Sequence, residues 1–172
     1  MVKNKQQSNK IMQRIIGVAA ASGLVYGLIA LSRQNESARP GEAFPSQGEQ
    51  HIAVGSAHPA YNSNPPTSGW HYATPADWGV HVNELPDEQI LHNLEHGGIW
   101  ISYKGIADAE KAELERISRT DSKIIVTPRS ANDSAIALAS WGRVQKLMEF
   151  DAAVIVKFIK ANKNKSPEPF AQ

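Results

Sequence analysis

The chain has 172 residues, of which 41% are hydrophobic and 20% charged, and its formal net charge is +1. This length and composition are those of one globular domain with short appendages, and they exclude a disordered chain. The near-neutral charge gives no electrostatic basis for binding nucleic acid, and the absence of cysteine excludes disulfides, thiolate nucleophiles and thiolate-bound zinc or iron–sulfur sites.

The first 32 residues have the pattern of a membrane anchor. A basic leader at 1–14 precedes an uncharged, apolar run at 15–32, which Arg33 closes. The run is at the short end of what spans a bilayer, and its basic flank predicts a cytoplasmic N-terminus with the rest of the chain on the extracytoplasmic side, periplasmic or extracellular. The alternative is a signal peptide cleaved after Ala19-Ala20-Ala21, although these small residues come early in the apolar run.

A linker and a long loop follow the apolar run. Residues 33–50 are polar and contain Pro and Gly, which predicts a linker, and a short strand at 51–54 opens the predicted globular domain, 51–162. Residues 56–86 contain five prolines, a density that excludes long helices and central strands. Three aromatic residues indicate that this segment is an ordered loop that packs on the domain: Trp70, Tyr72 and Trp78.

Helical and strand patterns alternate after the loop. Pro86 and two following acidic residues predict the start of a helix, and Gly97-Gly98 predict its end. The next predicted elements are a strand at 99–103, a helix at 107–119, strands at 123–127 and 135–141, and a helix at 150–161, followed by a loose tail at 163–172. This order predicts an α+β fold: a small mixed sheet with flanking helices and a long ordered Pro/Gly-rich loop, after one N-terminal transmembrane helix.

The histidines are the main candidates for a functional site. All six lie between His51 and His96, and His92 and His96 are four residues apart on the predicted helix, so they share one face and can chelate one ion. Glu95 can add a carboxylate oxygen or orient a ligating imidazole. Without a metal, His92 would be exposed and His96 would sit at the helix C-terminus, where a cation is favoured.

A second motif can supply the third ligand. In Pro65-Pro66-Thr67-Ser68-Gly69-Trp70-His71-Tyr72 the prolines stiffen the approach, Gly69 permits a tight turn, and His71 lies between two aromatic residues, where burial keeps an imidazole neutral and able to ligate. The same loop region also offers His51, His58 and His81.

These motifs, with Trp78-Gly79 between them and Ser140-Trp141-Gly142-Arg143 after them, resemble a bacterial family of uncharacterised domains. Its members usually have one N-terminal membrane anchor and an extracytoplasmic domain, and the resemblance runs from about His51 to Glu168. By position, it implies that the recurrent polar residues are His71, His92, Glu95 and His96, with His51 a less firm match. His58 and His81 have no place in the pattern, and the resemblance implies no particular ion.

The sequence therefore predicts a membrane-anchored, extracytoplasmic metal-binding domain with His71, His92, His96, Glu95 and His51 as ligands, and copper or zinc as the ion. One alternative is a structural or assembly protein of a membrane complex that binds no metal. Another is a metal-dependent hydrolase with Glu95 as the general base, because His92 to His96 spell the His-x-x-Glu-His pattern of inverted zinc peptidases. The sequence leaves the membrane partner and the oligomeric state open.

Overall fold

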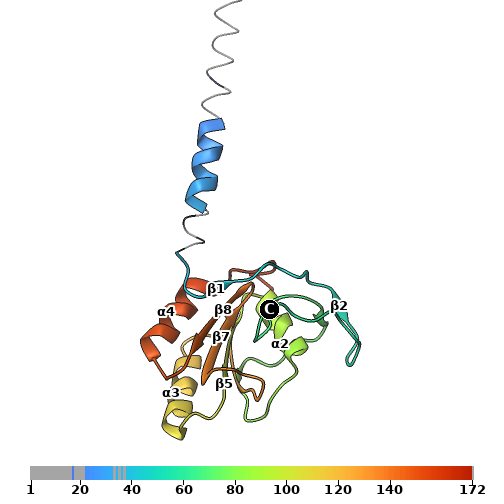
Figure 1. Ribbon diagram of the computed structural model, residues 1–172, viewed down its shortest axis with the longest axis vertical. Helices are drawn as coiled ribbons and strands as arrows, with labels where there is room; N and C mark the ends of the chain where they lie inside the picture. The colour runs from blue at the N-terminus through green and yellow to red at the C-terminus, as the bar shows by residue number, and fades with distance from the viewer. Residues whose placement is uncertain (1–16, 18–21, 33, 35, 37, 172) are drawn as a thin grey trace, which may run out of the picture. The chain divides into compact units, whose positions relative to one another are not determined.

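The computed structural model describes residues 17, 22–32, 34, 36 and 38–171 and is drawn in Figure 1. The chain divides into two compact units, Met1–Arg39 and Pro40–Gln172. In the first unit residues 22–32 are helical, but none of the described helices is both long and apolar enough to cross a membrane. The predicted leader at 1–14 lies outside the described residues, as does much of the predicted anchor at 15–32, so the anchor stays a prediction.

A six-stranded sheet forms the centre of the second unit. Its order is β1 (Glu42–Ala43), β8 (Arg143–Leu147), β7 (Ile136–Ser140), β5 (Ile99–Tyr103), β6 (Ile124–Pro128) and β4 (Gly79–Val80). Strand β6 is parallel to both β5 and β4, whereas the pairings from β5 through β7 and β8 to β1 are antiparallel. The predicted α+β fold with a mixed sheet is confirmed.

Helices cover both faces of this sheet. Helices α3 (Asp108–Ser118) and α4 (Ala152–Asn162) lie on one side of it, and α2 (Asp87–Glu95) lies on the other (Figure 1). The alternation of side chains along β5 separates two cores, because Ile99 and Ile101 pack with α3 and α4 whereas Trp100 packs with α2. Helix α2 follows Pro86 and is capped by His96 before Gly97, as the sequence predicts.

The long loop is ordered by its own hydrogen bonds and by a small second sheet. Strand β2 (His51–Ile52) pairs in parallel with β3 (His71–Tyr72). The Tyr61 hydroxyl donates to the Trp70 carbonyl at 2.6 Å, and residues 65–69 are buried. The loop is thus a rigid layer beside α2.

Three strands of the large sheet have no counterpart in the sequence prediction, and one of them, β4, lies within the predicted loop. Strand β8 forms a hairpin with β7 through Trp141 and Gly142, whose φ is +68°, and its Arg143, Gln145 and Lys146 hide the strand pattern. Strand β1 lies within the predicted linker, and only its pairing with β8 makes it a strand.

The C-terminal segment, which the sequence predicts to be loose, is held against the end of α2. The Asn164 amide donates to the Gly97 carbonyl at 2.9 Å, and the Glu168 amide donates to the Glu95 carbonyl at 3.1 Å. These bonds involve only the backbone, so the polar, proline-containing sequence gives no sign of them.

Candidate metal centre

Three elements bring four potential ligands together. Strand β2 contributes His51, β3 contributes His71, and the last turn of α2 contributes His92 and Glu95. Each residue offers one ligand atom, and the four atoms lie within 4.8 Å of one another. This His51–His71–His92–Glu95 group, called here the primary group, can hold a metal ion.

Backbone carbonyls fix the orientation of two of these imidazoles. His71 Nδ1 lies 2.8 Å from the Gly69 carbonyl oxygen, and His92 Nδ1 lies 2.8 Å from the Tyr72 carbonyl oxygen. A carbonyl only accepts, so each Nδ1 must carry the proton and donate it. In the neutral ring Nε2 then keeps its lone pair, the arrangement that metal-ligating histidines usually have.

The turn before β3 places His71 in this orientation. Gly69 has φ +117°, a conformation that favours glycine, and its carbonyl turns toward the ring two residues later. The His71 side chain is fully buried, and its ring meets Trp141 edge-on with 6.3 Å between the ring centroids. Gly69, two residues before His71 in the motif, therefore has a structural role.

Glu95 faces two imidazoles from a buried position. Its carboxylate Oε2 lies 3.0 Å from His71 Nε2 and 3.4 Å from His51 Nε2, and the residue is 3% exposed. Two ligands of a tetrahedral zinc ion, with bonds of 2.0–2.1 Å, are about 3.3 Å apart. Because His71 Nε2 and the carboxylate are both acceptors when the ring is neutral, the contact needs a proton or a cation between them.

Burial favours the neutral form of His92. The pKa of His92 is lowered from its usual value of 6.5, first by burial and then by the nearby imidazoles of His96 and His71, although the Tyr72 carbonyl opposes the shift. A neutral imidazole is the form that binds metal.

Helix α2 is itself fixed to the loop by Asn93. Its side-chain oxygen accepts from the Ala76 amide, and its side-chain nitrogen donates to the Ala76 carbonyl, each at 2.9 Å. Asn93 is 1% exposed. This pair of buried hydrogen bonds holds the helix that carries His92 and Glu95 in one position relative to the loop.

His96 does not join the primary group. The sequence predicts that His92 and His96 share one ion, but the structure places His96 in a second group with Glu95 and Glu168. His96 caps the end of α2, and its ring meets the His92 ring edge-on at a centroid distance of 4.5 Å. Its Nε2 lies 3.6 Å from Glu168 Oε2 in the C-terminal segment.

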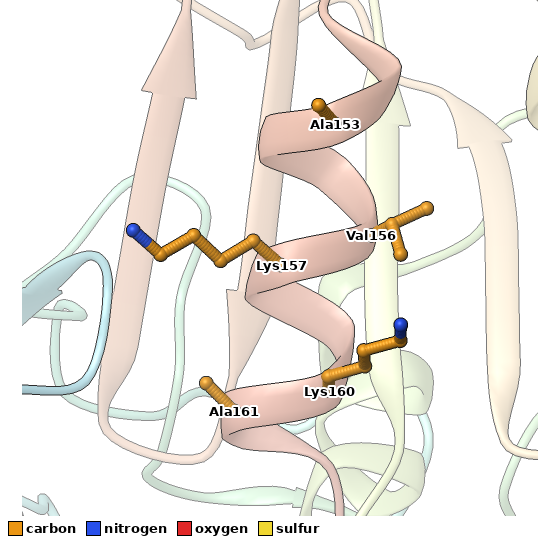
Figure 2. A pocket seen from close by; sticks show the side chains of 5 residues that line it. All are labelled: Ala153, Val156, Lys157, Lys160 and Ala161. Atoms are coloured by element: carbon orange, nitrogen blue, oxygen red, sulfur yellow. The ribbon is translucent and has the colours of Figure 1, made fainter.

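The remaining histidines lie outside both groups. His58 contacts Glu88 at 3.2 Å, and His81 contacts the Asp77 carbonyl at 2.8 Å. Glu168 is the one group member that sequence reasoning missed, because a glutamate between two prolines in a polar tail has no local signal for ligation. A hollow on the outer surface of α4 is also separate from the site, since it is lined by Ala153, Val156, Lys157, Lys160 and Ala161 (Figure 2).

Comparison with known proteins gives a family match. Residues 54–172 match the family model described as "Protein of unknown function (DUF3105)". The match includes His71, His92, Glu95, His96 and Glu168 and begins three residues after His51. No curated protein sequence and no solved structure shows significant similarity to the chain.

Proposed function

The chain belongs to the DUF3105 family, whose function is unknown, and we propose that its primary group binds a divalent transition-metal ion, copper or zinc. The single observation that carries the proposal is the pair of Nδ1 bonds to the Gly69 and Tyr72 carbonyls. These bonds hold two imidazoles with Nε2 free to ligate, beside a buried carboxylate.

The donor atoms favour copper or zinc among the common ions. Three imidazole nitrogens and one carboxylate oxygen suit zinc, Cu(II) or nickel, whereas magnesium and calcium prefer sites made of oxygen alone. The chain has no cysteine, and Met148 is 74% exposed, so the primary group has no soft sulfur ligand to favour Cu(I).

The half-exposed His51 gives the site a side open to solvent. Its side chain is 48% exposed, whereas His71 is fully buried. An ion can therefore enter from the His51 side without unfolding the loop, and this openness suits metal handling better than a closed structural site.

We also propose the cellular setting that the sequence predicts. The basic leader and the apolar run at 15–32 support a single N-terminal membrane anchor with the domain on the extracytoplasmic side, where a membrane protein partner can meet it. Reporters fused to the C-terminus test this topology, since one that is active only in the cytoplasm should be silent.

The alternative without metal rests on the same contact. If His71 is protonated on both nitrogens, the His71–Glu95 pair is an ion pair that only stabilises the fold, as a structural or assembly protein would require. We assign Glu95 no role as the general base of a hydrolase, because its carboxylate already faces two imidazoles.

The experiment that separates these readings uses the full-length chain, purified in mild detergent and stripped with a chelator. Thermal unfolding is measured with and without Zn(II) and with and without Cu(II). An ion that binds only the folded state at 100 times its Kd adds about 2.7 kcal/mol of stability, so the melting temperature should rise by several degrees. An unchanged melting temperature with both ions would overturn the metal-binding proposal and favour the ion-pair alternative.

A further inference from the structure

We propose that a second divalent metal ion binds beside the first, held by His96, Glu168 and Glu95, with the Glu95 carboxylate shared by the two ions. This inference rests on the proposed function, because it extends the primary group to a two-metal centre. The second group, Glu95–His96–Glu168, also offers three ligand atoms within 4.8 Å of one another, and Glu95 is the residue common to both groups.

The distances within the second group suit a cation bound between its members. His96 Nε2 and Glu168 Oε2 are 3.6 Å apart, which exceeds a hydrogen-bond distance but is close to the separation of about 3.3 Å between two ligands of one zinc ion. His96 is 9% exposed, and its Nδ1 is buried without a hydrogen-bond partner. A buried polar nitrogen without a partner is costly, and an ion bound at Nδ1 would remove that cost, whereas an ion bound at Nε2 would not.

The two carboxylates of the second group also favour the binding of a positive charge. Oxygen atoms of Glu95 and Glu168 lie within 4.8 Å of each other, and Glu95 is buried. Like charges at this distance repel unless a proton or a cation lies between them. A carboxylate has two oxygens, so Glu95 can face the primary group and the second group together, and carboxylates commonly join metal ions about 3.5–4 Å apart.

The C-terminal segment is fixed where it delivers Glu168. The Glu168 amide donates to the carbonyl of Glu95 itself at 3.1 Å. Lys123 Nζ donates to the carbonyls of His96, Pro169 and Ala171 at 2.8, 3.0 and 2.9 Å, which uses all three of its donors. The backbone of Glu168 and the carbonyls of Pro169 and Ala171 are therefore tied to the end of α2, which places Glu168 beside the site.

The test counts metal ions on the full-length chain. Chelator-stripped protein is loaded in separate samples with Zn(II) and Cu(II), passed through gel filtration, and analysed by elemental mass spectrometry. We expect two ions per chain in the parent, and one in both Glu168→Gln and His96→Gln. Glu149→Gln is the matched control, since Glu149 is an exposed carboxylate that belongs to neither group, and it should keep two.

Every outcome decides between the two proposals. Two ions in the parent and one in Glu168→Gln support the shared centre. One ion in the parent and one in Glu168→Gln would overturn the second site and leave the proposed function standing. Two ions in the parent and two in Glu168→Gln would have the same consequence. No ion in the parent overturns the proposed function and the second site with it.

A further substitution tests the role of the C-terminal segment. Lys123→Met removes the three bonds that hold the segment but removes no proposed ligand. It should weaken binding of the second ion by about tenfold or more while the first ion stays bound, because ligands that are not held in place bind metal less tightly. Equal weakening of both ions would contradict this role.

Discussion

His51 and His71 are directly paired residues in the parallel pairing of β2 with β3. Their ring centroids are 4.9 Å apart, and both Nε2 atoms approach the same Glu95 oxygen. The small second sheet therefore does more than order the loop: its register presents two imidazoles to the carboxylate at the end of α2. Two of the four potential ligands of the primary group thus depend on a strand pairing that is only two residues long.

The first prediction compares two histidines that contact carboxylates. His71 contacts Glu95 within the primary group, and His58 contacts Glu88 at 3.2 Å outside it. We expect His71→Asn to lower the affinity for zinc or copper by at least about 100-fold, since it removes a ligand, whereas His58→Asn should leave it within about twofold. Titration calorimetry on the stripped chain measures both, and equal losses would show that the primary group is not the binding site.

The second prediction concerns the pH dependence of stability without metal. The folded-state pKa of His92 is lowered below 6.5, so as the pH falls through 6.5 the unfolded chain binds a proton at this residue before the folded chain does. Stability is therefore present above pH 6.5 and is lost as the pH falls toward and through the folded-state pKa. We expect denaturant unfolding to show this loss between pH 7.5 and 5.5 in the stripped parent and a smaller loss in His92→Gln. Identical slopes would mean that His92 titrates normally.

The third prediction concerns the glycine that lets α2 lie close to the loop. A Cβ added at Gly98 would lie 2.6 Å from the Trp78 ring and 2.7 Å from the Asn93 carbonyl oxygen. Gly98→Ala should therefore destabilise the domain by about 3 kcal/mol, because the core must shift to make room. Gly105→Ala is the control, since Gly105 has φ +68° with open space around it and costs only about 1 kcal/mol of backbone strain. Chemical denaturation measures both, and equal losses would remove the steric explanation.

A feature of the fold or of the candidate site can be predicted from the sequence when its signal lies in neighbouring residues of the chain. Pro86 and Gly97 mark the ends of α2 by local backbone chemistry, and the prediction of that helix was confirmed. His71 and Glu95 could be identified from motif spacing, but their contact depends on the pairing of β2 with β3, which two residues cannot encode locally. The same reason explains why the sequence predicts a linker where β1 lies.

The division of the histidines between two groups was also beyond local reasoning. A spacing of four residues correctly indicates that His92 and His96 are neighbours, and their rings are in contact distance. Apart from Glu95, the potential ligands beside the His92 ring come from β2 and β3, whereas the one beside the His96 ring comes from the C-terminal segment. That segment is held by backbone carbonyls, whose positions no side-chain pattern reveals.

The last prediction tests the amide that fixes α2 to the loop. Asn93→Asp keeps an acceptor for the Ala76 amide but replaces the donor to the Ala76 carbonyl with an oxygen, so that two acceptors face each other at a residue that is 1% exposed. Leaving buried polar groups unsatisfied in this way should cost about 2–3 kcal/mol in the free energy of unfolding.

Asn62→Asp is the matched control for this change. Asn62 also donates its side-chain amide to a backbone carbonyl, that of Pro45 at 2.8 Å, but Asn62 is exposed and water can replace the lost bond. Urea unfolding of the stripped proteins should show a much smaller loss for this variant. The metal-dependent rise in melting temperature should also shrink in Asn93→Asp and not in Asn62→Asp, because Asn93, unlike Asn62, joins the helix that carries His92 and Glu95 to the loop. A full metal response in Asn93→Asp would show that the two ligands of α2 keep their positions without this clamp.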